Sequence, residues 1–102
     1  MAYPKDIDLI NRLCDATQSG ELEWKPTAYP ERYVAAVKGV YTLLIFRDLE
    51  RDSFGLTLHD ASGREVHTIK SVDVSRVEEL FDMARRGALN VDGTIDEILG
   101  EL

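Results

Sequence analysis

Two histidines and a glutamate lie close together in the sequence and are the residues best suited to metal chemistry. His59 and His67 flank a predicted turn, and Glu65 lies between them. If residues 54–60 and 64–69 form a hairpin, His59 pairs with Glu65 and His67 with Thr57. Two imidazoles and a carboxylate on one face can bind a divalent cation. We expect exposed hairpin side chains instead, with a metal site or a pH-sensitive contact as the alternatives.

Nucleophilic chemistry has little support in this sequence. The single cysteine, Cys14, falls within an apolar helical stripe, where a thiol packs as a small hydrophobe, with a reactive thiol as the alternative. Four serines occupy predicted turn or cap positions, where hydroxyls bond to the backbone. These are Ser53, Ser62, Ser71 and Ser75. We therefore expect no catalytic residues and no enzymatic activity.

Paired carboxylates offer a possible acid–base site in residues 47–52. Asp48, Glu50 and Asp52 alternate there with Arg47 and Arg51. Carboxylates in acid–base pairs need an environment that separates their pKa values. Carboxylates interleaved with arginines are more typical of a solvated loop, which is what we expect here.

Charge and composition exclude several classes of partner. The chain has 102 residues, with 12 basic against 19 acidic side chains, giving a net charge of −7. This sign opposes binding to nucleic acid and to anionic membranes. The seven glycines form no phosphate-binding loop, so we expect no cofactor. The apolar stretch 40–46 is too short to span a membrane and residues 1–8 do not resemble a signal peptide, so we expect a cytoplasmic location.

The hydrophobic patterning predicts one α+β domain over residues 1–102. An amphipathic helix is expected over 5–19, ending at Gly20. Short alternating segments then predict an antiparallel five-stranded meander. The strands are expected at 21–27, 32–37, 40–47, 54–60 and 64–69. A helix beginning after Asp73 or Ser75 and a second short helix up to Leu102 complete an α-β-β-β-β-β-α-α order.

Turn chemistry predicts which residues share a face of the sheet. Lys38-Gly39 reads as a two-residue hairpin turn, which pairs Val37 with Val40 and Tyr33 with Leu44. Gly63 reads as a bulge that pairs Leu58 with Val66. The predicted core follows from these registers, and Trp24 is expected to be at least partly buried against helix residues, with an exposed binding anchor as the alternative. The core residues are Leu44, Phe46, Leu56, Leu58, Val77, Leu80 and Phe81.

Two segments are candidates for contact with another protein. The strand 40–46 is apolar on both faces, so its second face needs cover from the chain's own helices or from a partner. The predicted register places the candidate contact residues on that face, and a homodimer would cover them if the helices share the other face. They are Val34, Ala36, Tyr41, Leu43 and Ile45.

The second candidate segment is the acidic C-terminal region. Its four carboxylates have no Lys or Arg between them. They are Asp92, Asp96, Glu97 and Glu101. Such a run is typical of a solvated helix face, and the alternative is a surface that docks on a basic partner or imitates nucleic-acid charge.

Three segments of the chain resemble a group of small bacterial and phage α+β proteins whose function is uncharacterised. In the first, Ala16-Thr-Gln-Ser-Gly-Glu-Leu-Glu-Trp24 matches an A-T-x-x-G-x-[IL]-x-W signature, in which a helix leads into a strand meander. The segments 84–92 and 98–102 are similar to the C-terminus of that group. The resemblance implies a small bacterial or phage-borne α+β protein and carries no activity or catalytic residue.

These observations favour a non-enzymatic protein-interaction or regulatory module that forms a homodimer or binds a protein partner. One alternative is an acidic inhibitor, such as an antitoxin, immunity or anti-defence protein, that occupies a basic site. Its basis is the net charge of −7 and the C-terminal carboxylates. A further alternative is a small-ligand binder or enzyme without a recognisable motif.

Overall fold

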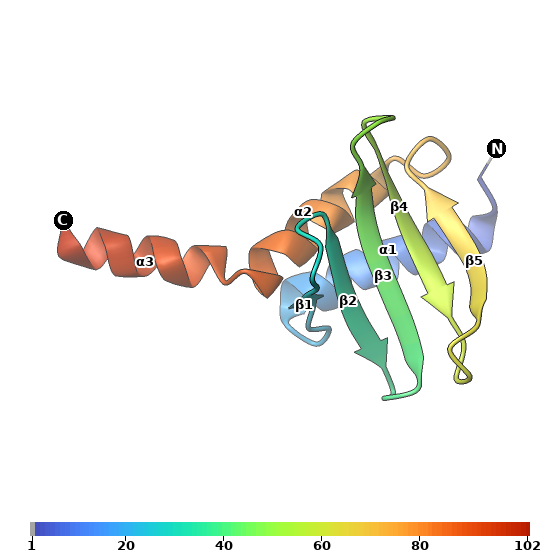
Figure 1. The fold of residues 1–102 in the computed structure, drawn as a ribbon, viewed down its shortest axis with the longest axis horizontal. Helices are drawn as coiled ribbons and strands as arrows, with labels where there is room; N and C mark the ends of the chain where they lie inside the picture. Colours follow the sequence, from blue (N-terminus) through green and yellow to red (C-terminus); the bar gives the residue numbers. More distant parts are fainter. Residues whose placement is uncertain (1) are drawn as a thin grey trace.

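The α+β order predicted from the sequence is confirmed by the structure. The structure is a computed structural model, and it describes residues 2–102. One helix precedes a five-stranded sheet, and two helices follow it (Figure 1). The elements are α1 (Pro4–Ser19), β1 (Lys25–Pro26), β2 (Arg32–Val37), β3 (Tyr41–Asp48), β4 (Ser53–His59), β5 (Glu65–Lys70), α2 (Arg76–Ala88) and α3 (Val91–Glu101).

The sheet is an antiparallel meander, and two helices lie against the same face of it. The strand order is β1-β2-β3-β4-β5, and Figure 1 shows α1 and α2 behind the sheet while α3 extends away from it. The ring of Phe81 in α2 contacts Tyr33 and Phe54 on the covered face, with centroids 5.7 and 5.1 Å apart. From α1, Asp6 reaches β5 through a 3.0 Å contact with His67.

Local signals set both ends of α1 and the entry into the sheet. Pro4 occupies the first turn, and Gly20 ends the helix with a φ of 84°. Trp24 is 5% exposed, and its indole Nε1 donates to Thr17 Oγ1 at 3.0 Å. The expected burial of Trp24 against helix residues is therefore confirmed, and the helix is α1.

The predicted pairing of β2 with β3 is wrong by one residue. The turn at Lys38-Gly39 forms, and Val40 N donates to Val37 O at 3.1 Å. The ladder, however, pairs Val37 with Tyr41, so Val40 is an extra residue in the third strand segment. Since side chains alternate across a strand, this single residue exchanges the two faces of β3.

The shift corrects the predicted contact face and part of the predicted core. Leu43 and Ile45 are 5% and 0% exposed on the covered face, and Tyr41 shares their side of β3. Val34 and Ala36 lie on the opposite face, so the five candidate residues do not form one surface. Leu44 and Phe46 are half-buried on that opposite face and lie outside the core.

The rest of the predicted core is supported by the structure. Leu56, Val77 and Leu80 are each 0% exposed and Phe81 is 6% exposed. Leu58 is half-buried and packs against this core.

The second hairpin shows a similar one-residue irregularity. The turn forms as predicted, with Gly63 at a φ of 85° and Asp60 N donating to Arg64 O at 2.9 Å. His59 pairs with Glu65 as expected, but Leu58 pairs with His67 because the ladder is irregular between Leu58 and His59. The predicted pairs Leu58–Val66 and His67–Thr57 are therefore wrong.

Candidate interaction surfaces

One face of the sheet carries no helix, and we call it the open face. Two rows of paired residues cross it. The first row runs Arg32, Phe46, Gly55, Lys70, and the second runs Lys25, Val34, Leu44, Thr57, Thr68. Ala36 and Thr42 extend the face toward the β2–β3 turn. The centre of this face is therefore apolar and threonine-rich, and cations lie at its borders.

Phe46 lies flat across β4 because Gly55 has no side chain. A Cβ built on Gly55 would be 2.4 Å from Phe46 Cζ, well inside van der Waals contact. The ring therefore occupies the space of the missing side chain, and Gly55 itself is buried. This arrangement places a large aromatic ring on the open face, in the row near the β1–β2 and β3–β4 loops.

Two of the threonines on this face bond to each other through their hydroxyl groups. Thr57 Oγ1 and Thr68 Oγ1 lie 3.0 Å apart in a hydrogen bond between β4 and β5. Thr57 is 5% exposed although no helix covers it. Because this bond is internal, each hydroxyl oxygen keeps one hydrogen-bond partner when a second chain covers the pair, and one hydroxyl hydrogen remains to be satisfied.

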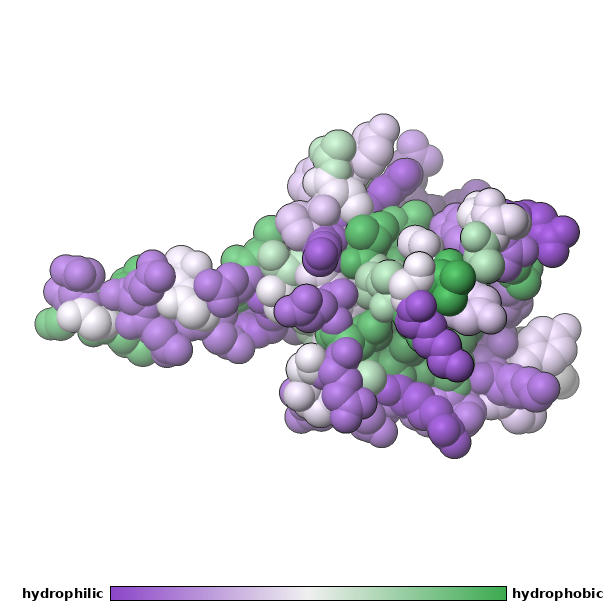
Figure 2. All heavy atoms as spheres, turned by 90° about the horizontal axis from the view of Figure 1, so that it is seen from below, coloured by the Kyte–Doolittle hydropathy of each residue, from purple (hydrophilic) through white to green (hydrophobic). Residues whose placement is uncertain are grey.

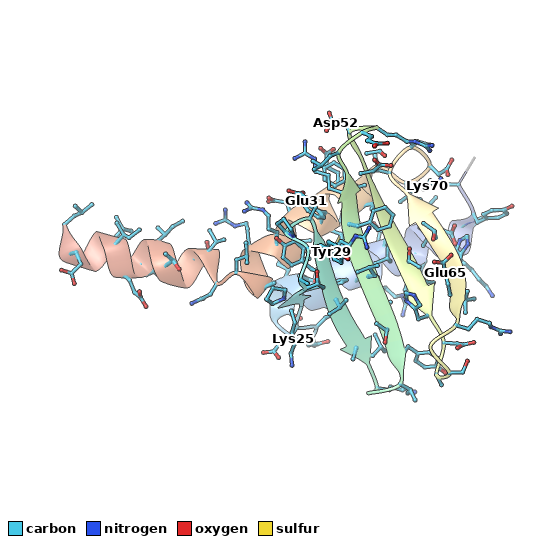
Figure 3. The ribbon with its side chains drawn as sticks, in the orientation of Figure 1. Lys25, Tyr29, Glu31, Asp52, Glu65 and Lys70 are labelled. Atoms are coloured by element: carbon cyan, nitrogen blue, oxygen red, sulfur yellow. The ribbon has the colours of Figure 1, made fainter. Side chains whose placement is uncertain are left out.

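The cations around the open face lack carboxylate partners. Lys25 and Lys70 mark opposite edges of the sheet in Figure 3, and Arg32 lies between them in the row of Phe46. The Arg32 guanidinium lies 4.8 Å from the Tyr29 ring centroid, a cation–π contact. Within residues 2–102, none of these three cations forms an ion pair.

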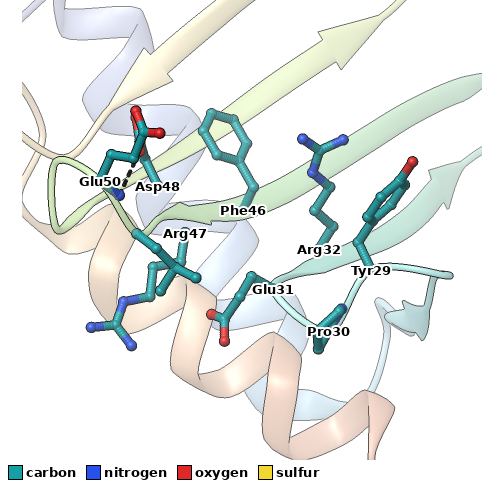
Figure 4. A pocket seen from close by; sticks show the side chains of 9 residues that line it. Tyr29, Pro30, Glu31, Arg32, Phe46, Arg47, Asp48 and Glu50 are labelled. Carbon is teal, nitrogen blue, oxygen red and sulfur yellow. Dashed lines mark hydrogen bonds between the residues drawn. The ribbon is translucent and has the colours of Figure 1, made fainter.

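A groove of about 610 Å³ lies at one end of the open face, between the β1–β2 and β3–β4 loops. Figure 4 shows Tyr29, Arg32 and Phe46 rising from the same side of the sheet. Asp48 closes the far wall, where its Oδ1 accepts from Glu50 N at 3.1 Å. Because the aromatic rings belong to separate loops and strands, the sequence pattern did not reveal this groove.

A second hollow, of about 380 Å³, lies on the covered side where α1 meets the hairpin turns. Figure 2 shows green atoms gathered in the centre of this end of the molecule. Tyr41 is 48% exposed and Val66 is 59% exposed at its rim. The other apolar residues in its wall are Leu9, Val37, Leu43 and Leu58.

The last helix, α3, leaves the rest of the molecule and buries none of its residues. Its apolar residues recur at helical spacing on one side, and we call them the α3 stripe: Val91, Ile95, Ile98, Leu99 and Leu102. Ile98, Leu99 and Leu102 are 55%, 62% and 96% exposed. Beyond the half-buried Val91, the stripe is therefore exposed apolar surface.

The acidic residues of α3 stay in solvent, apart from one ion pair. Asp92 accepts a hydrogen bond from Arg86, which ties the first turn of α3 to α2. Asp96, Glu97 and Glu101 are exposed, and within the described part of the chain they form no ion pair. The solvated helix face expected from the sequence is therefore present.

The two histidines do not converge on one site. His67 Nε2 contacts Asp6 Oδ2 at 3.0 Å, so this ring is directed toward α1. His59 Nδ1 is buried and has no hydrogen-bond partner. Among residues 2–102, no group of three or more His, Cys, Asp or Glu side chains is arranged to hold a metal ion.

Cys14 is buried, and two of the four serines form hydrogen bonds through their hydroxyl groups. Cys14 is 1% exposed, and burial raises the pKa of its thiol. Ser71 Oγ accepts from Phe54 N at 2.9 Å, and Ser62 Oγ donates to Asp60 Oδ1 at 2.7 Å. These contacts are the packing and turn roles predicted for Cys14, Ser62 and Ser71.

Comparison with known protein families, curated proteins and solved structures found no match. In residues 2–102, every helix is too short or too polar to cross a bilayer.

Proposed function

We propose that this chain is a non-enzymatic protein-interaction module, of a regulatory or accessory kind, in the cytoplasm of a bacterial or phage system. In this proposal it assembles with a second copy of itself through the open face. The observation that carries the proposal is that α1 and α2 share one face of a sheet whose other face is also apolar. An apolar patch of this kind on a soluble protein is typical of an interface.

A two-fold dimer is the simplest way to cover such a face. The same patch then serves both copies, because a two-fold interface is self-complementary. Val34, Leu44 and Phe46 are already half-buried, so little side-chain freedom remains to be lost when a partner covers them. The Thr57–Thr68 hydrogen bond is internal, so only one of the two hydroxyl hydrogens of this pair still needs an acceptor in the interface.

Sedimentation equilibrium over a range up to about 100 µM tests self-association by mass action. We expect a dimer for the natural sequence and a monomer for Ala36→Glu, because Ala36 is exposed at the open face and its substitution leaves the core intact. Val72→Glu is the matched control, since Val72 is 77% exposed in a loop away from this face. A natural sequence that stays monomeric throughout, at low and high salt, rejects the proposal.

The exposed carboxylates of α3 favour a second candidate, an acidic inhibitor that occupies a basic site. Asp96, Glu97 and Glu101 form an acidic surface on a projecting helix and have no ion pair among residues 2–102. Such a surface binds a basic partner through contacts that salt weakens. A monomeric chain with a salt-labile basic partner, lost when the three residues are changed to Asn and Gln, would favour this function instead.

A further inference from the structure

We propose that α3 of each copy lies across the open face of the other copy, in a reciprocal exchange. This inference rests on the proposed self-association and names the segment that covers the open face. Four observations carry it: α3 lacks cover, it does not reach its own sheet, its length matches the open face, and its charge complements that face.

α3 requires a partner to be a stable helix. It has 11 residues, and isolated helices shorter than about 12–15 residues are marginal in water. Most helix stability in proteins comes from packing an apolar side, and beyond the half-buried Val91 the residues of the α3 stripe are exposed in the described chain. A second surface must therefore supply that packing.

The junction with α2 directs α3 away from its own sheet. Asn90 has a φ of 50°, a left-handed conformation that breaks the helical path between α2 and α3. The molecule extends 47 Å along its longest axis against 30 and 26 Å along the others, and α3 projects along that axis (Figure 1). α3 therefore projects away from its own sheet, where a second copy can reach it.

The dimensions of α3 match those of the open face. An α-helix of 11 residues is about 16 Å long. Five strands spaced at about 4.8 Å give a sheet roughly 19 Å wide. A helix laid across the strands would therefore extend from near Lys25 at the β1 edge to near Lys70 at the β5 edge.

The charges on the two surfaces are of opposite sign. Asp96 and Glu101 flank the α3 stripe, Glu97 lies on the opposite side of the helix, and no basic residue occurs in α3. Lys25 and Lys70 lie at the edges of the open face without ion pairs in the described chain. Opposite charges around an apolar centre fix the orientation of docking partners, whereas pairing α3 with another α3 would bring two acidic surfaces together.

The buried area also favours reciprocal exchange. Burying half the curved surface of an 11-residue helix of about 10 Å diameter removes on the order of 250 Å² from water. One helix on one sheet face, or one α3 against another, therefore buries about 500 Å² in total. Two reciprocal contacts bury about 1,000 Å², which is near the lower limit for a specific interface.

Zero-length cross-linking of carboxylates to lysines tests the proposal in the intact chain. Isotope-labelled and unlabelled protein are mixed, so that links between copies are distinguished from links within one copy. We expect mixed-isotope links from the α3 carboxylates to Lys25 and Lys70. Links from α3 to Lys38 instead would place the helix near the turns that border the second hollow, and would overturn the proposal.

Substitution of the α3 stripe provides a second readout. We expect Ile98→Asp to raise the dissociation constant of the dimer at least about tenfold, as for a central interface residue. Val72→Glu again serves as the control, and circular dichroism verifies that the sheet is intact. If Ile98→Asp and the control dimerise equally and no α3 links form, this inference fails while the proposed self-association stands. If the natural sequence is monomeric, both fail.

Discussion

Leu43→Ala and Leu44→Ala are the same substitution at adjacent positions, and the structure predicts that they lower the free energy of unfolding by unequal amounts. Leu43 is 5% exposed on the covered face and pairs with Ala35 and Leu58. Leu44 is half-buried on the open face and pairs with Val34 and Thr57. The comparison therefore reports directly which face of β3 lies under the helices.

The expected magnitudes follow from burial. Each substitution removes three carbons, worth about 0.8 kcal/mol per buried group, or about 2.4 kcal/mol for full burial. At Leu43 a residual cavity increases the loss in unfolding free energy to about 3–4 kcal/mol. At Leu44 water already reaches part of the side chain and no enclosed cavity forms, so we expect a loss of about 1.5 kcal/mol or less.

Urea unfolding followed by the fluorescence of Trp24 measures both losses, because this single tryptophan is buried in the folded state. The measurement belongs at low protein concentration, where self-association does not stabilise the folded chain. The two midpoints convert to free energies only if the denaturant slopes agree. An equal or larger loss for Leu44→Ala would show that the face assignment of β3 is wrong.

The surroundings of Cys14, Gly55 and Asp60 give three further predictions. Cys14 should react with a thiol reagent only as the protein unfolds, because burial raises its pKa and blocks access; fast labelling of the folded protein would contradict this. Gly55→Ala should destabilise the domain by about 1–3 kcal/mol in thermal melts, since the new Cβ meets the ring of Phe46, and adding Phe46→Leu should recover part of the loss. The pKa of Asp60 is lowered chiefly because the Ser62 hydroxyl donates to its carboxylate. Its stability contribution is therefore present above about pH 4 and disappears as the pH falls through the lowered pKa, so urea midpoints of the natural sequence and Asp60→Ala should converge in acid.

Sequence reasoning succeeded where the structure depends on near neighbours. The helix end at Gly20 and the turn at 60–64 form as predicted because their conformations are set by φ preferences and short-range hydrogen bonds. The predicted pairing of β2 with β3 was wrong, although the prediction of a turn at Lys38-Gly39 was correct. One extra residue, Val40, was sufficient to exchange the faces of the strand.

Among the candidate interaction surfaces, too, some could be predicted from local sequence and others could not. The exposure of the acidic residues on the last helix was predictable, because a run of like charges is costly to bury. The sequence could not show whether Leu43 and Ile45 lie on a contact face or in the core. β3 is apolar on both sides, and its sequence alone does not show which side lies under a helix. The groove beside Tyr29 and Phe46 joins residues from separate segments, which no local pattern connects.

The sequence by itself determined the order of the elements, the positions of the turns and the acidic, helical character of the C-terminal arm, because each depends on local propensity and periodicity. Only the tertiary structure decided that α1 and α2 share one face, that Leu44 and Phe46 lie opposite the core, and that α3 projects without cover. These features depend on how apolar faces pack against one another at a distance along the chain. A strand with two apolar faces satisfies either arrangement locally, and only packing with the helices distinguishes them.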